Sequence, residues 1–112
     1  MKTLKIPRID IALFETIVDR IHHLNANGAE IAIDQINWKE TFSKYLPVTV
    51  HVAHDNNCLY LFYQIRGEVL RTVNNKDFMP VWEDSCVEFF MQRPQEKTYR
   101  NFECNALGVL LA

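Results

Sequence analysis

The N-terminal quarter of the chain has the periodicity of an amphipathic helix. Apolar side chains recur at intervals of four, four and three residues, at Leu13, Ile17, Ile21 and Leu24. Asp10 is a candidate N-cap, and Gly28 is a C-terminal stop that is free to take the left-handed conformation. The pattern therefore predicts one short α-helix over about residues 10–27.

From about residue 29 onward, apolar positions alternate with polar ones, which is the period of a half-buried strand. Two such segments, 48–53 and 59–66, flank the turn cluster Asp55-Asn56-Asn57 and predict an antiparallel hairpin. A weaker strand is expected over 69–73. Trp38 follows a polar turn, and we expect it to be a buried structural residue.

The segments 86–92 and 99–105 are the most informative strands. Because side chains alternate across a pleated sheet, pairing them would bury one apolar set together, namely Val87, Phe89, Phe102 and Cys104. The opposite face then carries Glu88, Gln92, Asn101, Glu103 and Asn105. Such a face is rich in groups that hydrogen-bond to hydroxyls.

Short antiparallel strands with turns every 8–12 residues predict an all-β fold, an antiparallel β-sandwich or jelly roll, preceded by the one short helix. We expect a single domain over residues 1–112, with strands over about 29–112. The sequence stops inside an apparent strand at 108–112 with about five or six strands in hand. Since two sheets normally need more, we expect the front part of a longer module.

Composition narrows the class of protein without naming a function. The 112 residues are 48% apolar with a net charge of −2, and this composition excludes a disordered chain. The sequence lacks the cluster of basic residues that would indicate nucleic acid binding. No apolar run is long enough to span a membrane. No signal peptide is visible, so a cytoplasmic location is expected unless the chain has been trimmed. Three cysteines without a CxxC pair favour reduced thiols.

The motif Trp82-Glu83-Asp84 opens one of the informative strands. An indole face packs on the apolar C–H face of a pyranose, and carboxylates accept hydrogen bonds from its hydroxyls. The alternative is a tryptophan that only covers the edge of the sandwich. The candidate ligand-binding residues are Trp82, Glu88, Asn101, Glu103 and Asn105.

Metal binding has weaker support. His51 and His54 are three apart in one strand and point to opposite faces, so they cannot chelate one ion. A structural calcium ion has weak candidate ligands in Asp55 and Asp84, which stand in turns that offer oxygen atoms. Neither turn matches a dedicated calcium loop, and a solvated turn is the favoured interpretation for both.

Catalysis is disfavoured relative to binding. Glycoside hydrolysis needs two carboxylates about 5–10 Å apart across a cleft. Four acidic residues are available for such a pair, Glu83, Asp84, Glu88 and Glu103, but strand carboxylates alone are weak evidence for an enzyme.

Four blocks of the sequence, within about residues 30–108, resemble the family 9 carbohydrate-binding modules, and more closely the stand-alone proteins of Bacteroidetes. The blocks are Ile33-Asp34 to Trp38, the hairpin Val48 to Tyr60, Val81-Trp82-Glu83-Asp84-Ser85-Cys86-Val87-Glu88-Phe89-Phe90, and Tyr99 to Gly108. The resemblance implies a DOMON-like β-sandwich, often secreted or periplasmic and often with structural calcium, that binds glucan- or xylan-type sugars.

The resemblance also implies roles for individual residues. Trp82 matches one of two tryptophans that clamp a sugar ring, and Glu88 matches an acidic residue that hydrogen-bonds the sugar. Two features depart from the family pattern. Glu103 stands where the family has a sugar-contacting arginine, and the second clamp tryptophan belongs to the later half of the module.

The leading hypothesis is therefore non-catalytic carbohydrate binding linked to carbohydrate catabolism. One alternative is a haem- or redox-binding DOMON-like domain, with candidate ligands Met79, Met91, His51 and His54. A second is an accessory part of a glycoside hydrolase, in keeping with the modular partners of the family. A third is a sandwich whose sugar site has decayed into a protein-interaction surface.

Overall fold

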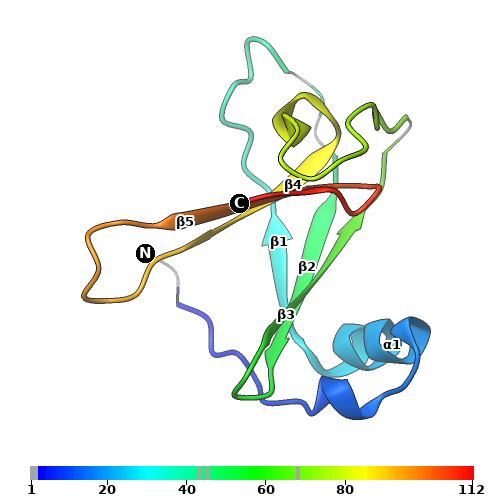
Figure 1. Ribbon diagram of the computed structural model, residues 1–112, viewed down its shortest axis with the longest axis vertical. Coiled ribbons are helices and arrows are strands. Elements are labelled where there is room, and N and C mark those ends of the chain that lie inside the picture. Colours follow the sequence, from blue (N-terminus) through cyan, green and yellow to red (C-terminus); the bar gives the residue numbers. More distant parts are fainter. Residues whose placement is uncertain (1–2, 43, 45, 68) are drawn as a thin grey trace. The chain divides into compact units, whose positions relative to one another are not determined.

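The computed structural model describes residues 3–42, 44, 46–67 and 69–112 (Figure 1). The chain consists of two compact units, which comprise residues 1–67 and residues 68–112. The fold is mostly β, with two antiparallel three-stranded sheets and one short α-helix, which confirms the predicted sandwich class. Among the described residues, no helix has the length and apolar character that crossing a membrane requires.

The first unit contains a sheet of order β1-β2-β3, formed by β1 (Ala29–Ile33), β2 (Val48–His54) and β3 (Leu59–Ile65). Helix α1 (Ile17–Asn27) lies beside one end of this sheet (Figure 1). A small core joins them, made of Ile11, Leu24 and Ala53, with Ile9, Tyr60 and Phe62 packed against it. The helix is thus attached through its C-terminal half.

Helix α1 begins at Ile17 and not near Asp10 as predicted. Thr16 is the N-cap, because its Oγ1 accepts the Asp19 N–H at 3.1 Å and donates to Asp19 Oδ2 at 2.7 Å. Asp10 makes no side-chain capping bond, and only a single 3₁₀ turn, η1 (Ile11–Leu13), follows it. The better cap lies six residues further on, and it sets the start of the helix.

Gly28 ends the helix for a different reason from the one predicted. Its φ of −67° and ψ of 159° are extended, not left-handed. A Cβ at this position would stand 2.6 Å from the Leu24 carbonyl oxygen and 3.2 Å from that of Val52. Glycine is therefore needed because the backbones of helix and sheet approach closely here.

The predicted hairpin is present as β2 and β3, with Val52 opposite Leu61 and His54 opposite Leu59. Asp55 organises the turn, since its Oδ1 accepts the N–H groups of Asn57 and Cys58. The Tyr60 hydroxyl donates to Asp55 Oδ2 at 2.6 Å. This bond is the main cause that lowers the pKa of Asp55 and raises that of Tyr60 to about 12.

The second unit contains the sheet of order β4-β5-β6, formed by β4 (Cys86–Met91), β5 (Arg100–Asn105) and β6 (Leu110–Leu111). Glu88 lies opposite Glu103 and Phe89 opposite Phe102, which is the predicted pairing. One face of the β4–β5 pair accordingly carries the predicted apolar set, Val87, Phe89, Phe102 and Cys104. The other face carries Glu88, Asn101 and Glu103.

The prediction of a strand over 69–73 is wrong, because this segment pairs with no strand of a sheet. Side chains accept its backbone N–H groups in place of a neighbouring strand. Ser85 Oγ accepts from Arg71 at 2.9 Å, and Asp84 Oδ1 accepts from Val73 at 3.1 Å. The segment therefore runs as an ordered loop against the turn that precedes β4.

Candidate functional site

The polar face of the β4–β5 pair brings two carboxylates and one amide together. Glu88 and Glu103 occupy directly opposite positions, an arrangement that is unfavourable for two like charges. Asn101 lies beside them, and its Nδ2 donates to Glu103 Oε1 at 2.8 Å and to Glu88 Oε2 at 3.5 Å. The amide thus bridges the two acids and reduces their repulsion.

The two acids differ in how far a ligand can reach them. Glu88 is exposed, whereas Glu103 and Asn101 are half-buried. The Glu103 Oε2 and Asn101 Oδ1 atoms are shielded from solvent and have no hydrogen-bond partner among the described residues. Glu88 is therefore the more accessible of the two acids, and Asn101, which bonds to both, holds them in place relative to each other.

Cys86 lies on the same face of β4, two residues before Glu88. Burial raises the pKa of its thiol, and the negative charges of Glu88 and Glu103 act in the same direction. The thiol therefore stays protonated and adds no nucleophile to the site.

Asn105 was predicted to bind the ligand, but its side chain is used inside the protein. It is only 5% exposed. Its Nδ2 donates to the Asn74 carbonyl at 2.7 Å and to Asp84 Oδ2 at 3.0 Å. Its Oδ1 accepts from the N–H groups of Leu107 and Val109, at 3.1 and 3.0 Å. Because every polar atom of the side chain is paired, we leave Asn105 out of the site.

Asp84 is the other half of this buried arrangement. Its two carboxylate oxygens accept from the N–H groups of Val73 and Asn74 and from the Asn105 amide, and Arg71 Nε lies 3.5 Å from Oδ1. Burial acts to raise the pKa of Asp84, but these hydrogen bonds outweigh it and lower the pKa.

These contacts do not fit a calcium ion at either predicted ligand. A Ca²⁺ site needs six to eight oxygen atoms directed at the cation, but the groups that surround the Asp84 carboxylate are donors. The Asp55 carboxylate is likewise used, within its own turn. Within the part of the chain that the structure describes, no three His, Cys, Asp or Glu side chains gather as a metal site requires.

Trp82 stands four residues before the start of β4. It lies in the 3₁₀ turn η2 (Val81–Glu83), which contacts both β4 and β5. Val81 is fully buried, whereas Trp82 is 58% exposed. The hydrogen bond between Asp84 and Asn105 fastens this turn to β5, and Asn105 projects from the same face as Asn101 and Glu103. The turn that carries Trp82 is thus attached at the end of the row of residues that contains Glu88.

The candidate haem ligands are distributed over the two units of the chain. The buried His51 pairs through Nε2 with Glu30 Oε2 at 3.2 Å, and its ring lies near Phe62. Met91 projects from the apolar face of β4, with Phe89. His51 and His54 stand in the first unit and Met91 in the second.

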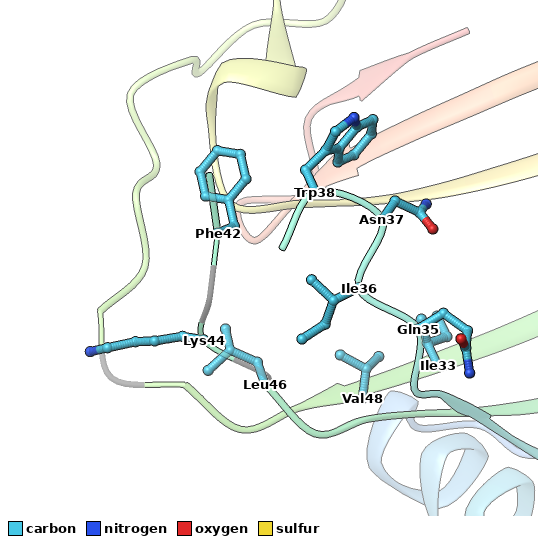
Figure 2. Close-up of a pocket in the computed structure, with 9 residues that line it drawn as sticks. All are labelled: Ile33, Gln35, Ile36, Asn37, Trp38, Phe42, Lys44, Leu46 and Val48. Atoms are coloured by element: carbon cyan, nitrogen blue, oxygen red, sulfur yellow. The ribbon is translucent and has the colours of Figure 1, made fainter. Parts of the chain in front are cut away.

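Trp38, predicted to be buried, is 67% exposed and lies at a pocket of about 300 Å³ in the first unit. Figure 2 shows its ring near that of Phe42, with Ile36, Leu46 and Val48 below them. The wall is mainly apolar, its polar side chains are Gln35, Asn37 and Lys44, and no carboxylate is among the lining residues that the structure describes. We therefore place the candidate site at Trp82 and not here.

Comparisons with known proteins bear on the family and the fold of the chain. A model of "Carbohydrate-binding family 9" matches residues 18–112. The crystal structure of a "putative carbohydrate-binding protein" from Bacteroides uniformis superposes with a TM-score of 0.76 at 28% sequence identity. The alignment covers 94% of this chain and 47% of that one, so the chain spans about half the length of that protein. No curated protein matches the sequence.

Proposed function

Because the chain belongs to carbohydrate-binding family 9, we propose that it recognises a polysaccharide or oligosaccharide through Trp82 and Glu88 on the polar face of the β4–β5 pair. The observation that carries this proposal is that both side chains are exposed, Trp82 in the turn before β4 and Glu88 on that strand. Asn101 and Glu103 act as positioning residues for Glu88.

The chemistry of the two groups suits a sugar. The exposed indole offers an apolar face for the C–H groups of a pyranose, and the Glu88 carboxylate accepts hydrogen bonds from hydroxyls at the ring's edge. Stacking on one aromatic ring contributes about 1–3 kcal/mol, if base stacking is used as the scale. A single platform therefore gives weak binding, which matches a module that attaches to a polymer with many repeated units.

Binding without catalysis is the form of the proposal that the geometry supports best. Glu88 and Glu103 share one amide on one sheet face, whereas a hydrolase places its two carboxylates on opposite sides of the scissile bond. The family's association with hydrolases then reflects modular partners. We propose a role in carbohydrate catabolism on this basis, with glucan- or xylan-type ligands.

Titration calorimetry with glucose, cellobiose and xylobiose tests the proposal. We expect heat from at least one of them, its loss in Trp82→Ala, and weaker binding in Glu88→Gln. Trp38→Ala is the matched control, because that tryptophan is exposed to a similar degree in the first unit. Heat from none of the sugars, or loss of binding in Trp38→Ala but not in Trp82→Ala, would contradict the proposal.

Two further measurements separate the alternatives. A Soret band in the purified protein would favour haem binding. Release of reducing sugar that Glu88→Gln abolishes would show that the chain is an enzyme. We expect neither result.

A further inference from the structure

The far end of the same polar face carries two exposed aromatic rings. Phe90 is 56% exposed and Tyr99 is 64% exposed. Their ring centroids lie 5.6 Å apart with the planes inclined at 54°, so they contact each other and form one continuous surface. The sequence-based set of ligand-binding residues did not include them, although the alternation in β4 puts Phe90 on the face of Glu88.

The register places this pair on the side of the sheet that carries the acids. Phe90 lies opposite Asn101, two residues along β4 from the Glu88–Glu103 pair. Side chains two residues apart on a strand share a face and are separated by about 7 Å. Tyr99 precedes β5, and its contact with Phe90 puts its ring on the same side.

The face therefore has a definite order from end to end. The turn with Trp82 is fastened at Asn105, the Glu88–Glu103 pair follows, and Phe90 and Tyr99 come next. Aromatic platform, carboxylates and aromatic platform succeed one another along the strands. A saccharide chain presents the complementary repeat, because each ring offers an apolar C–H face and a hydroxyl-rich edge.

We propose that Phe90 and Tyr99 form a second sugar-contacting platform, so that the ligand is an oligosaccharide that extends along the β4–β5 pair and not a single sugar. This inference rests on the proposed function, because it requires the first ring to bind at Trp82 and Glu88. The second platform adds affinity only for a ligand long enough to reach it. The site then prefers oligosaccharides to monosaccharides.

Calorimetry on the whole chain with xylose and xylotetraose, and with glucose and cellotetraose, tests the inference. We expect the tetrasaccharide of one pair to bind about 5- to 150-fold more tightly than its monosaccharide, the effect of one additional stacking contact. Phe90→Ala and Tyr99→Ala should remove this advantage and leave the monosaccharide affinity unchanged. Tyr99→Phe should keep it, because the ring remains.

Phe42→Ala is the matched control, since that ring is exposed to a similar degree in the first unit, and it should preserve the preference for the longer ligand. Equal affinity for both lengths in the native chain would overturn the inference while leaving the proposed function intact. So would a preference that persists in both alanine variants. Binding of no sugar, or sugar binding that Trp82→Ala leaves unchanged, would instead remove the proposed function and the inference with it. Circular dichroism shows whether Phe90→Ala or Tyr99→Ala has lost its fold. If one of them has, the affinities of the other variant decide whether the second platform exists.

Discussion

Two asparagines on one face of β5 should have different effects when each is replaced by alanine. Asn105 makes four hydrogen bonds, to Asn74, Asp84, Leu107 and Val109, and is 5% exposed. Among the described residues, the Asn101 side chain bonds to those of Glu88 and Glu103. We expect Asn105→Ala to destabilise the fold and Asn101→Ala to weaken sugar binding.

The magnitude for Asn105→Ala follows from the bonds that are lost. Each of the four contributes about 0.5–1.5 kcal/mol net, so the loss should be about 2–6 kcal/mol. For a chain of this length that corresponds to a fall in Tm of roughly 10 °C or more. Asn101→Ala removes the amide that bridges two acids and should cost about 1–2 kcal/mol, which is less than the cost of Asn105→Ala because two hydrogen bonds are lost and not four.

Urea unfolding followed by circular dichroism measures both variants, and calorimetry with the best-binding sugar measures their affinity. Because Asn105 fastens the turn that carries Trp82, the folded Asn105→Ala protein should also bind the sugar more weakly, whereas Asn101→Ala should weaken binding with a smaller loss of stability. An Asn105→Ala protein as stable as the native chain would refute the reasoning, since it would mean that the four bonds do not hold the turn. Equal destabilisation by the two variants would refute the distinction between them.

Two further outcomes follow from local geometry. Gly28→Ala should destabilise the chain by about 1–3 kcal/mol in urea unfolding, because its Cβ would meet the Leu24 carbonyl oxygen at 2.6 Å. Gly67→Ala is the control and should change the stability little, because the nearest atom to its Cβ would be 3.6 Å away. Equal losses of stability in the two variants would contradict this prediction. Ultraviolet titration should find one tyrosine with a pKa of about 12, assigned to Tyr60, and Asp55→Asn should return it toward 10.0. Because the folded pKa of Asp55 is lowered, its stabilisation should be present above about pH 4 and be lost as the pH falls through that lowered value, and Tyr60→Phe should reduce this loss. An unchanged tyrosine titration in Asp55→Asn would exclude the bond.

Most of the features that were predicted correctly follow from the alternation of apolar and polar side chains along the strands. It located the hairpin of β2 and β3 and the β4–β5 pairing with its two faces, because strand register and burial both depend on a period of two. The same logic put Glu88 on the polar face. These features are local, so a short stretch of sequence contains the information that specifies them.

Predictions failed where two local signals competed or where a distant group decided the outcome. Asp10 and Thr16 are both acceptable N-caps, and only the bonds with Asp19 distinguish them. The segment 69–73 has strand-like residues, but Asp84 and Ser85 take its N–H groups. The periodicity at Trp38 gives no indication of whether another segment covers the indole.

The polar face shows why alternation predicts orientation but not role. Asn101, Glu103 and Asn105 follow one another at intervals of two, and the sequence alone gives each the same claim to bind a ligand. The structure separates them because Asn74 and Asp84, which are 31 and 21 residues away, reach Asn105 and satisfy it. One side chain thereby becomes the fastening that holds the Trp82 turn against the sheet, and the carboxylate presented at the surface is left to Glu88. The candidate site therefore depends on a long-range contact that fastens the turn carrying Trp82, while the strand period supplies the polar groups on the β4–β5 face.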